Sequence, residues 1–168
     1  MLIRPAEPRD IDDLLDIRND AILHGTALWM DEPVDRAERE RWYEETTAAG
    51  DPILIADVDG RVAGYGTYGQ WREKSGYRFS VEDSVYVREG FQGQGIGRAL
   101  VEGLIAHAKA AGKRAMFADI EAGNAGSIRL HERLGFRRVG LLPGIGVKFG
   151  RSLDLAILHL PLEDAPRA

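Results

Sequence analysis

The sequence contains no cysteine, and this absence excludes several kinds of chemistry at once. Disulfide bonds, thiolate metal sites and a cysteine acyl-enzyme all need this side chain. Long apolar runs are also missing, since no stretch approaches the ~20 residues that a membrane helix needs. The opening residues, MLIRPAEPRD, lack the apolar region of a signal peptide. We therefore expect a soluble protein of the cytoplasm.

A surplus of positive charge is likewise absent. The 168 residues include 27 acidic and 22 basic side chains, which gives a formal net charge of -5. Proteins that bind nucleic acids normally present a basic face, so this balance argues against that class. The histidines show no spacing typical of metal ligands, and we predict no metal.

The patterns that are present predict one mixed α+β domain over residues 1–162, followed by a frayed tail at 163–168. With 44% hydrophobic residues, the chain can bury a core. Asp59 and Gly60 form a dipeptide typical of a tight hairpin turn. Periodicity predicts helices at 8–22, 35–49, 95–111 and 124–134, and strands at 2–4, 52–57, 62–69, 78–87, 115–120, 136–142 and 153–160.

A glycine-rich loop lies between a predicted strand that ends at Val87 and the predicted helix that follows. Residues 92–97 are Gln-Gly-Gln-Gly-Ile-Gly, with a glycine at every second position. Glycine lets the backbone come close to a ligand, and the start of a helix offers unpaired N–H groups and a partial positive charge. A tight turn without a ligand is the alternative, but three glycines at this place favour a phosphate or pyrophosphate site.

Two common nucleotide motifs do not fit this loop. A Walker A loop requires Lys followed by Ser or Thr after its last glycine, and that pair does not follow here. A dinucleotide fingerprint requires glycine at its sixth position, which is Arg98 counted from Gly93 and Leu100 counted from Gly95. Both readings are therefore excluded.

Two segments resemble the cofactor motifs of the GCN5-related N-acetyltransferases (GNAT). Gln92, Gly95 and Gly97 match the signature Gln-x-x-Gly-x-Gly, and residues 124–136 (NAGSIRLHERLGF) resemble the second motif of the family. The resemblance implies a central, mainly antiparallel sheet that is splayed around the cofactor and flanked by helices. It also implies that acetyl-CoA is the co-substrate and that the loop amides hold its pyrophosphate.

The resemblance extends to individual cofactor contacts. In this family the strand before the loop hydrogen-bonds the pantetheine arm, and one N–H, here that of Val87, polarises the thioester carbonyl. Asn124 is implied as a contact, with a plain helix N-cap as the alternative. Arg98 and Arg133 can reach phosphates or can be ordinary solvated charges. The implied contacts are Val85, Tyr86, Val87, Gln92, Gly93, Gln94, Gly95, Ile96, Gly97, Arg98, Asn124, Ser127 and Arg133.

Within the family, three segments resemble the phosphinothricin and methionine sulfoximine acetyltransferases: VEDSVYV at 81–87, SIRLHE at 127–132 and KFGRSLD at 148–154. The similarity spans nearly the whole chain. It implies acetylation of the α-amine of a glutamate-like or methionine-derived amino acid, a role in detoxification or resistance, and a homodimer. Two positions depart from the branch: Asp83, where His or Ser is common, and Ser152, where part of the branch has tryptophan.

The resemblance also implies two catalytic side chains. Glu82 aligns with the base of the branch, which removes a proton from the substrate ammonium before attack; a solvated strand glutamate is the alternative. His131 stands where a tyrosine often protonates the departing CoA thiolate, and an imidazole titrates near neutral pH. A structural helix histidine is the alternative there. We expect direct transfer in a ternary complex.

The acceptor is expected to bind near the loop that precedes the strand with Glu82. The guanidinium groups of this loop can hold a carboxylate, phosphinate or sulfone, whereas a charged hairpin tip without a ligand is the alternative. Two rival functions stay open, namely acetylation of a protein N-terminus and CoA sensing without turnover. The implied substrate contacts are Trp29, Arg72, Ser75, Gly76, Tyr77 and Arg78.

Overall fold

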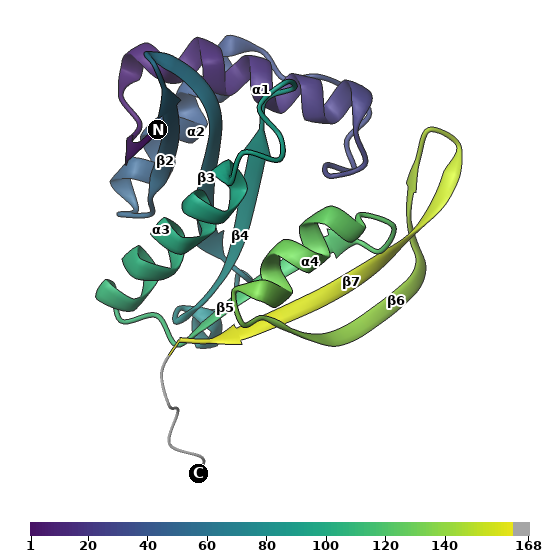
Figure 1. Ribbon diagram of the computed structural model, residues 1–168. Coiled ribbons are helices and arrows are strands. Elements are labelled where there is room, and N and C mark those ends of the chain that lie inside the picture. Colours follow the sequence, from purple (N-terminus) through teal and green to yellow (C-terminus); the bar gives the residue numbers. More distant parts are fainter. Residues whose placement is uncertain (163–168) are drawn as a thin grey trace.

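The computed structural model describes residues 1–162 and contains one seven-stranded sheet with helices on both of its faces (Figure 1). The strand order is β1-β2-β3-β4-β5-β7-β6. Neighbouring strands are antiparallel except for the parallel pair β4 and β5. The elements are β1 (Leu2–Pro5), η1 (Pro8–Asp10), α1 (Ile11–His24), α2 (Arg36–Ala48), β2 (Ile53–Val58), β3 (Arg61–Gln70), η2 (Ser75–Tyr77), β4 (Ser80–Val87), α3 (Ile96–Ala110), β5 (Ala115–Glu121), α4 (Ala125–Arg133), β6 (Arg137–Lys148) and β7 (Arg151–Pro161).

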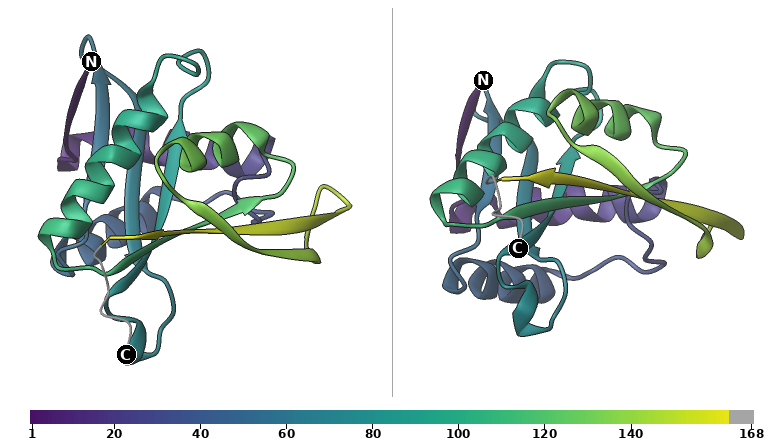
Figure 2. Two further views of the ribbon diagram at one scale, coloured as in Figure 1. Left: turned by 60° about the horizontal axis from the view of Figure 1, so that its bottom comes forward. Right: turned by 90° about the horizontal axis from the view of Figure 1, so that it is seen from below.

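The helices divide between the two faces of the sheet. Helices α3 and α4 lie on one face and α1 and α2 on the other (Figure 2). Helix α3 packs on the sheet because Leu100, Leu104 and Ala108 recur at every fourth position, and all three are fully buried. On the opposite face, Leu14 and Ile17 of α1 pack against the first strands. The predicted α+β fold with a mainly antiparallel sheet is thereby confirmed.

The pairing of β4 with β5 is short, and this feature positions the site. The two strands pair only at Ser80↔Ala115, Val81↔Met116 and Glu82↔Phe117. Strand β4 continues to pair with β3 as far as Val87, while β5 continues along β7. The sheet therefore opens after Glu82, and the edge of β4 that faces β5 has no strand partner among residues 1–162 from residue 83 onward.

The hairpin of β6 and β7 is longer than the sequence indicated. The sequence predicted that the first of these strands ends at residue 142 and that the second begins at residue 153. In the structure, β6 continues to Lys148 and β7 begins at Arg151. Pro143 and Gly144 interrupt the apolar pattern, and the structure accommodates them in a register irregularity between Leu142 and Gly146. The hairpin projects beyond the rest of the sheet (Figure 2).

Other boundaries differ by a few residues. The first predicted helix starts as the 3-10 turn η1, and the predicted strand at 78–87 starts at Ser80 because η2 occupies the loop before it. Across residues 1–162, no helix combines the length and apolar character that a membrane crossing requires. The frayed tail predicted at 163–168 lies outside the described residues, and the boundary of the domain at 162 stays a prediction.

Candidate active site

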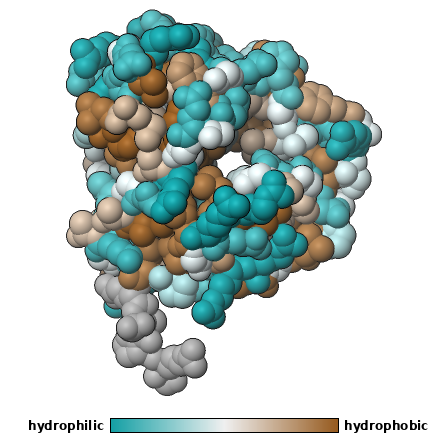
Figure 3. Space-filling model, in the orientation of Figure 1, coloured by the Kyte–Doolittle hydropathy of each residue, from teal (hydrophilic) through white to brown (hydrophobic). Residues whose placement is uncertain are grey.

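A cleft of about 780 Å³ opens where β4 and β5 separate. It lies between the loop after β4, the start of α3, strand β5 and helix α4. The space-filling view shows the surface hollowed between this loop and α4, with hydrophilic side chains around the hollow (Figure 3). The predicted cofactor residues that line it are Val85, Tyr86, Val87, Gln92, Gly93, Gly95, Ile96, Gly97, Arg98, Asn124, Ser127 and Arg133, whereas Gln94 does not.

The backbone of the glycine loop turns toward the cleft through two left-handed residues. Gly93 has φ 77° and Gly95, the N-cap of α3, has φ 80°. A side chain is strained in this region of φ, and glycine is not. The side chain of Gln92 holds the loop, because its Oε1 accepts the N–H of Gly90 at 2.9 Å. Because α3 begins here, its first N–H groups have no intrahelical partners and lie at the wall of the cleft.

Helix α4 forms the facing wall. It approaches α3 closely at Gly97, where a Cβ would stand 3.2 Å from Cδ2 of Leu130. Asn124 caps α4, since its Oδ1 accepts the N–H of Ser127 at 3.1 Å. The N-cap interpretation of Asn124 is therefore correct, and the residue also lines the cleft.

Glu82 lies at the point where the sheet opens, in the last pair between β4 and β5, and lines the cleft. Burial, together with the charges of Asp119 and Asp83, raises the pKa of Glu82 to about 7, against an opposing effect of Arg72. A carboxyl group with this pKa can accept a proton near neutral pH. Asp119 of β5 lines the same cleft, and burial raises the pKa of its carboxyl as well.

His131 is buried in the cleft wall with both ring nitrogens hydrogen-bonded. Its Nε2 is 3.0 Å from Oδ2 of Asp83, and its Nδ1 is 2.8 Å from the carbonyl oxygen of Ser127. The carbonyl oxygen of Ser127 and the carboxyl oxygen of Asp83 can both accept, so this arrangement favours the imidazolium form of His131, which donates at both nitrogens. Burial opposes that charge, but the Asp83 carboxylate outweighs it and the pKa of His131 is raised.

Residues 12–136 match the Acetyltransferase (GNAT) family. The chain belongs to this family. The L-methionine sulfoximine/L-methionine sulfone acetyltransferase of Salmonella typhimurium is 45% identical over 164 residues, which are 98% of this chain and 96% of that one. The predicted family and acetyltransferase class are confirmed.

Solved GNAT structures give the same result. An acetyltransferase-family protein from Salmonella typhimurium, solved with its cofactor acetyl-CoA, has a TM-score of 0.97 and 44% identity, covering 100% of this chain and 97% of that one. A phosphinothricin acetyltransferase from Sinorhizobium meliloti, in complex with acetyl-CoA, has a TM-score of 0.95 and 36% identity, with coverage of 98% and 90%. The GNAT fold of this chain is thus that of proteins that bind acetyl-CoA.

The predicted substrate residues of this GNAT chain do not line the cleft. Ser75, Gly76 and Tyr77 form the exposed turn η2, and the guanidinium of Arg78 stacks on Phe79 at 4.7 Å. Arg72 is exposed, but its charge acts on the cleft carboxylates Glu82 and Asp119, lowering their pKa values. Arg72 thus influences the carboxyl groups of the site through its charge, without lining the cleft.

Trp29 lies outside the cleft but beside residues that line it. Its Nε1 donates to the carbonyl oxygen of Thr26 at 3.0 Å, and its ring packs against Gly146 of β6. The neighbouring residues Ala27 and Leu28 line the cleft instead. The segment between α1 and α2 therefore reaches the site, although through different side chains.

Sequence reasoning missed two features of this GNAT site. Asp119 was not named, although an acidic residue within an apolar strand is a usable signal. The partnership of Asp83 with His131 was also missed, because the two are 48 residues apart. Asp83 had been noted as a departure from the branch, and the structure shows that it is the hydrogen-bond partner of His131.

Proposed function

We propose that this protein transfers the acetyl group of acetyl-CoA to the α-amine of a small amino acid or analogue of the methionine sulfoximine, methionine sulfone or phosphinothricin type. The observation that carries the proposal is the position of Glu82, a carboxyl with a pKa of about 7, at the point where β4 leaves β5. The activities named for the Salmonella and Sinorhizobium relatives support the choice of acceptor. Detoxification or resistance is the corresponding role.

The cleft fits acetyl-CoA in size and in chemistry. Backbone amides at the start of α3 suit the pyrophosphate, and Arg98 of α3 and Arg133 of the facing helix α4 both line the cleft. The unpaired edge of β4 at residues 85–87 offers backbone groups to the amide-containing pantetheine arm. When bound, acetyl-CoA supplies the activated acetyl thioester.

Three groups of this chain then carry the transfer. Glu82 takes the proton of the substrate ammonium, directly or through water, which frees the nitrogen lone pair for attack. The N–H of Val87 donates to the thioester oxygen as negative charge develops there. His131, or a nearby tyrosine, gives a proton to the CoA sulfur as the C–S bond breaks, and the second proton that the nitrogen loses on forming the amide passes to solvent; Nε2 of His131 is 3.0 Å from Oδ2 of Asp83.

We further infer that two copies associate through β6. This edge strand exposes apolar side chains, with Val139 59% and Val147 70% exposed, and Leu141 and Ile145 lie between them. Sedimentation of the wild type as a dimer, and of Val147→Asp as a monomer, is expected. A monomeric wild type at micromolar concentration would contradict the dimer.

A cytoplasmic location stays a prediction from the sequence.

The proposed activity is tested with a panel of amines and acetyl-CoA. The panel contains L-methionine sulfone, L-methionine sulfoximine, phosphinothricin, the unmodified amino acids and short peptides with free N-termini. We expect N-acetylation of the first three, detected by mass spectrometry and by release of free thiol. Calorimetry with CoA runs in parallel on the same protein. Binding of CoA without acetylation of any amine would favour a sensor, and acetylation of peptides alone would favour an N-terminal acetyltransferase.

A further inference from the structure

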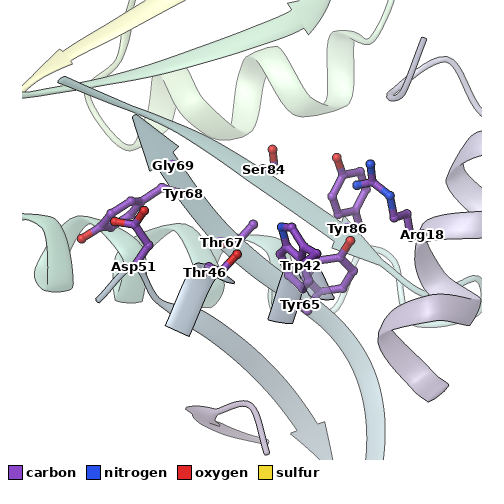
Figure 4. A pocket seen from close by; sticks show the side chains of 10 residues that line it. All are labelled: Arg18, Trp42, Thr46, Asp51, Tyr65, Thr67, Tyr68, Gly69, Ser84 and Tyr86. Carbon is purple, nitrogen blue, oxygen red and sulfur yellow. The ribbon is translucent and has the colours of Figure 1, made fainter. Parts of the chain in front are cut away.

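A second cavity, of about 200 Å³, lies on the α1 and α2 face of the sheet. Four side chains gather at one end of it: Arg18 from α1, Trp42 from α2, Tyr65 from β3 and Tyr86 from β4 (Figure 4). The ring centroids of Tyr65 lie 6.2 Å from Trp42 and 5.1 Å from Tyr86. We call this end the Arg18 pocket. The carboxylate of Asp51 lies toward the other end of the cavity (Figure 4).

The Arg18 pocket is next to the proposed base. Alternate residues of a strand point to the same face, so Glu82, Ser84 and Tyr86 share the α1 and α2 face of β4. Ser84 and Tyr86 line both this cavity and the large cleft. A small molecule whose amine is held at Glu82 therefore lies on the face of β4 whose next residues, Ser84 and Tyr86, also line this cavity.

The pocket presents hydrogen-bond donors that have no acceptor. Within the described residues, Nε of Arg18 and the hydroxyl of Tyr65 are buried and have no hydrogen-bond partner. Tyr65 is 1% exposed, and its hydroxyl lies on the side of the ring toward Arg18 (Figure 4). The guanidinium of Arg18 donates from Nη2 to the sulfur of Met30 at 3.5 Å, and a thioether is a weak acceptor.

A second buried cation stands behind Trp42. Arg39 is 0% exposed and stacks on the Trp42 ring at 3.8 Å. Among residues 1–162, its Nε and Nη1 have no hydrogen-bond partner, and its Nη2 is 3.4 Å from Oε1 of Glu38. Buried donors and charges without partners are costly in a folded protein. Arg18 and Tyr65 thus bring donors without an acceptor to the pocket, and the charge of Arg39 lies behind Trp42.

Resting on the proposed function, we propose that the Arg18 pocket binds the oxygen-bearing end of the acceptor amino acid, with Arg18 and Tyr65 as donors. The ligand chemistry is a group of strongly accepting oxygens, which either the α-carboxylate or the sulfone, sulfoximine or phosphinate group of the acceptor supplies. The guanidinium fork suits two oxygens on one atom. Arg39 acts through its charge and is not in contact with the acceptor.

The variants Arg18→Met and Tyr65→Phe test this assignment, with Arg41→Met as the matched control. Arg41 is an exposed arginine of α2 that does not line the cavity. For Arg18→Met we expect the KM for L-methionine sulfone to rise roughly 10- to 100-fold, the usual effect of losing a charge-assisted hydrogen bond. Tyr65→Phe should raise it roughly 3- to 10-fold. The KM for acetyl-CoA and the kcat at saturating acceptor should change less than about twofold.

Two further acceptors identify which oxygens enter the pocket. L-Methionine keeps the carboxylate and lacks the sulfone oxygens, whereas the carboxamide of methionine sulfone lacks the carboxylate. If the carboxylate enters, Arg18→Met has no effect on the carboxamide but weakens L-methionine. If the sulfone enters, the pattern is reversed. Both patterns support the pocket.

Thermal unfolding and calorimetry distinguish acceptor binding by Arg18 from a purely structural role of this residue. Arg18→Met should unfold at the same or a higher temperature, because it removes an incompletely paired charge. L-Methionine sulfone, titrated into the enzyme with CoA, should bind the wild type and the Arg41→Met variant alike. Unchanged acceptor KM in Arg18→Met, or an equal loss of stability and of acetyl-CoA binding, overturns the assignment and leaves water as the partner of these donors. A wild type that acetylates no amino acid overturns the proposed function instead.

Discussion

The candidate ligand sites on the two sides of strand β4 are built by different means. In the cleft on the α3 and α4 side, the candidate phosphate site is the backbone of one continuous loop, with Gly93 and Gly95 in left-handed conformations. The Arg18 pocket on the other side is built from side chains of four separate elements. A backbone site leaves a compact motif in the sequence, whereas a side-chain site assembled from distant segments does not. The loop of the candidate cofactor site is therefore visible as a motif in the sequence, whereas the grouping of side chains in the Arg18 pocket is not.

The largest expected effect concerns Glu82, which lies between the two sides. Glu82→Gln should lower kcat by roughly 10²- to 10⁴-fold, because the amide cannot take the proton of the ammonium. In the wild type, kcat/KM should rise with pH through about 7, since the carboxyl must lose its proton before it can act as a base. Initial rates between pH 5 and 9 provide the measurement. A variant that keeps both the rate and the pH step would remove Glu82 from the mechanism.

The next effect is on stability and concerns the buried pair of Asp83 and His131. Asp83→Asn should lower the free energy of unfolding by roughly 3 kcal/mol, because the imidazolium loses its buried partner. The raised pKa of His131 means that this stabilisation is complete below the pKa of the unfolded state and disappears as pH rises through the folded pKa. Urea unfolding should therefore separate variant and wild type most at acidic pH. Exposed Asp16, changed to Asn, is the control.

The same variant distinguishes two roles for His131. If His131 protonates the CoA sulfur, Asp83→Asn lowers the pKa of this acid, so the variant should keep more of its kcat at lower pH, while His131→Ala loses kcat at every pH. If the pair only positions α4 against β4, both variants should lose kcat to a similar degree. Single-turnover rates with L-methionine sulfone decide between these outcomes.

A smaller effect is expected in the glycine loop. Gly95→Ala places a side chain at φ 80°, which costs about 1–2 kcal/mol and turns the amides away from their ligand. We expect a roughly 10-fold rise in the Kd for acetyl-CoA, measured by calorimetry. Gly50→Ala, at φ 76° and with open space around the added atom, is the matched control. Should both variants bind alike, backbone geometry would not explain the cofactor side.

The smallest expected effect is on the pH dependence of the rate, and it concerns the loop that contains Arg72 and Arg78. Arg72 lowers the pKa of Glu82, so Arg72→Met should move the midpoint of the rate profile upward. Arg78 stacks on Phe79 and lies outside the cleft, so Arg78→Met should leave the midpoint in place. An equal shift in both variants would mean that the loop acts through its overall charge.

Most of the fold and the cofactor side could be predicted because the relevant signals are local. Helix α3 was indicated by apolar residues at every fourth position, and the loop at 92–97 by its glycines. The β6 segment around Pro143 was missed because tertiary pairing with β7 overrides a poor local pattern. The pairing of Asp83 with His131 could not be predicted, since spacing along the chain does not show which helix face meets which strand.

The short ladder between β4 and β5 has a mechanical consequence. Strands β1 to β4 form one half-sheet and β5 to β7 another. Strands β4 and β5 pair at three neighbouring positions, next to which the carbonyl of Phe79 accepts the N–H groups of Arg114 and Ala115. A molecule bound along the gap would contact both half-sheets and hold them at a fixed distance from each other. Its binding free energy would then add to the rigidity of the whole domain, so the enzyme would be stiffest while loaded and most compliant when the product leaves.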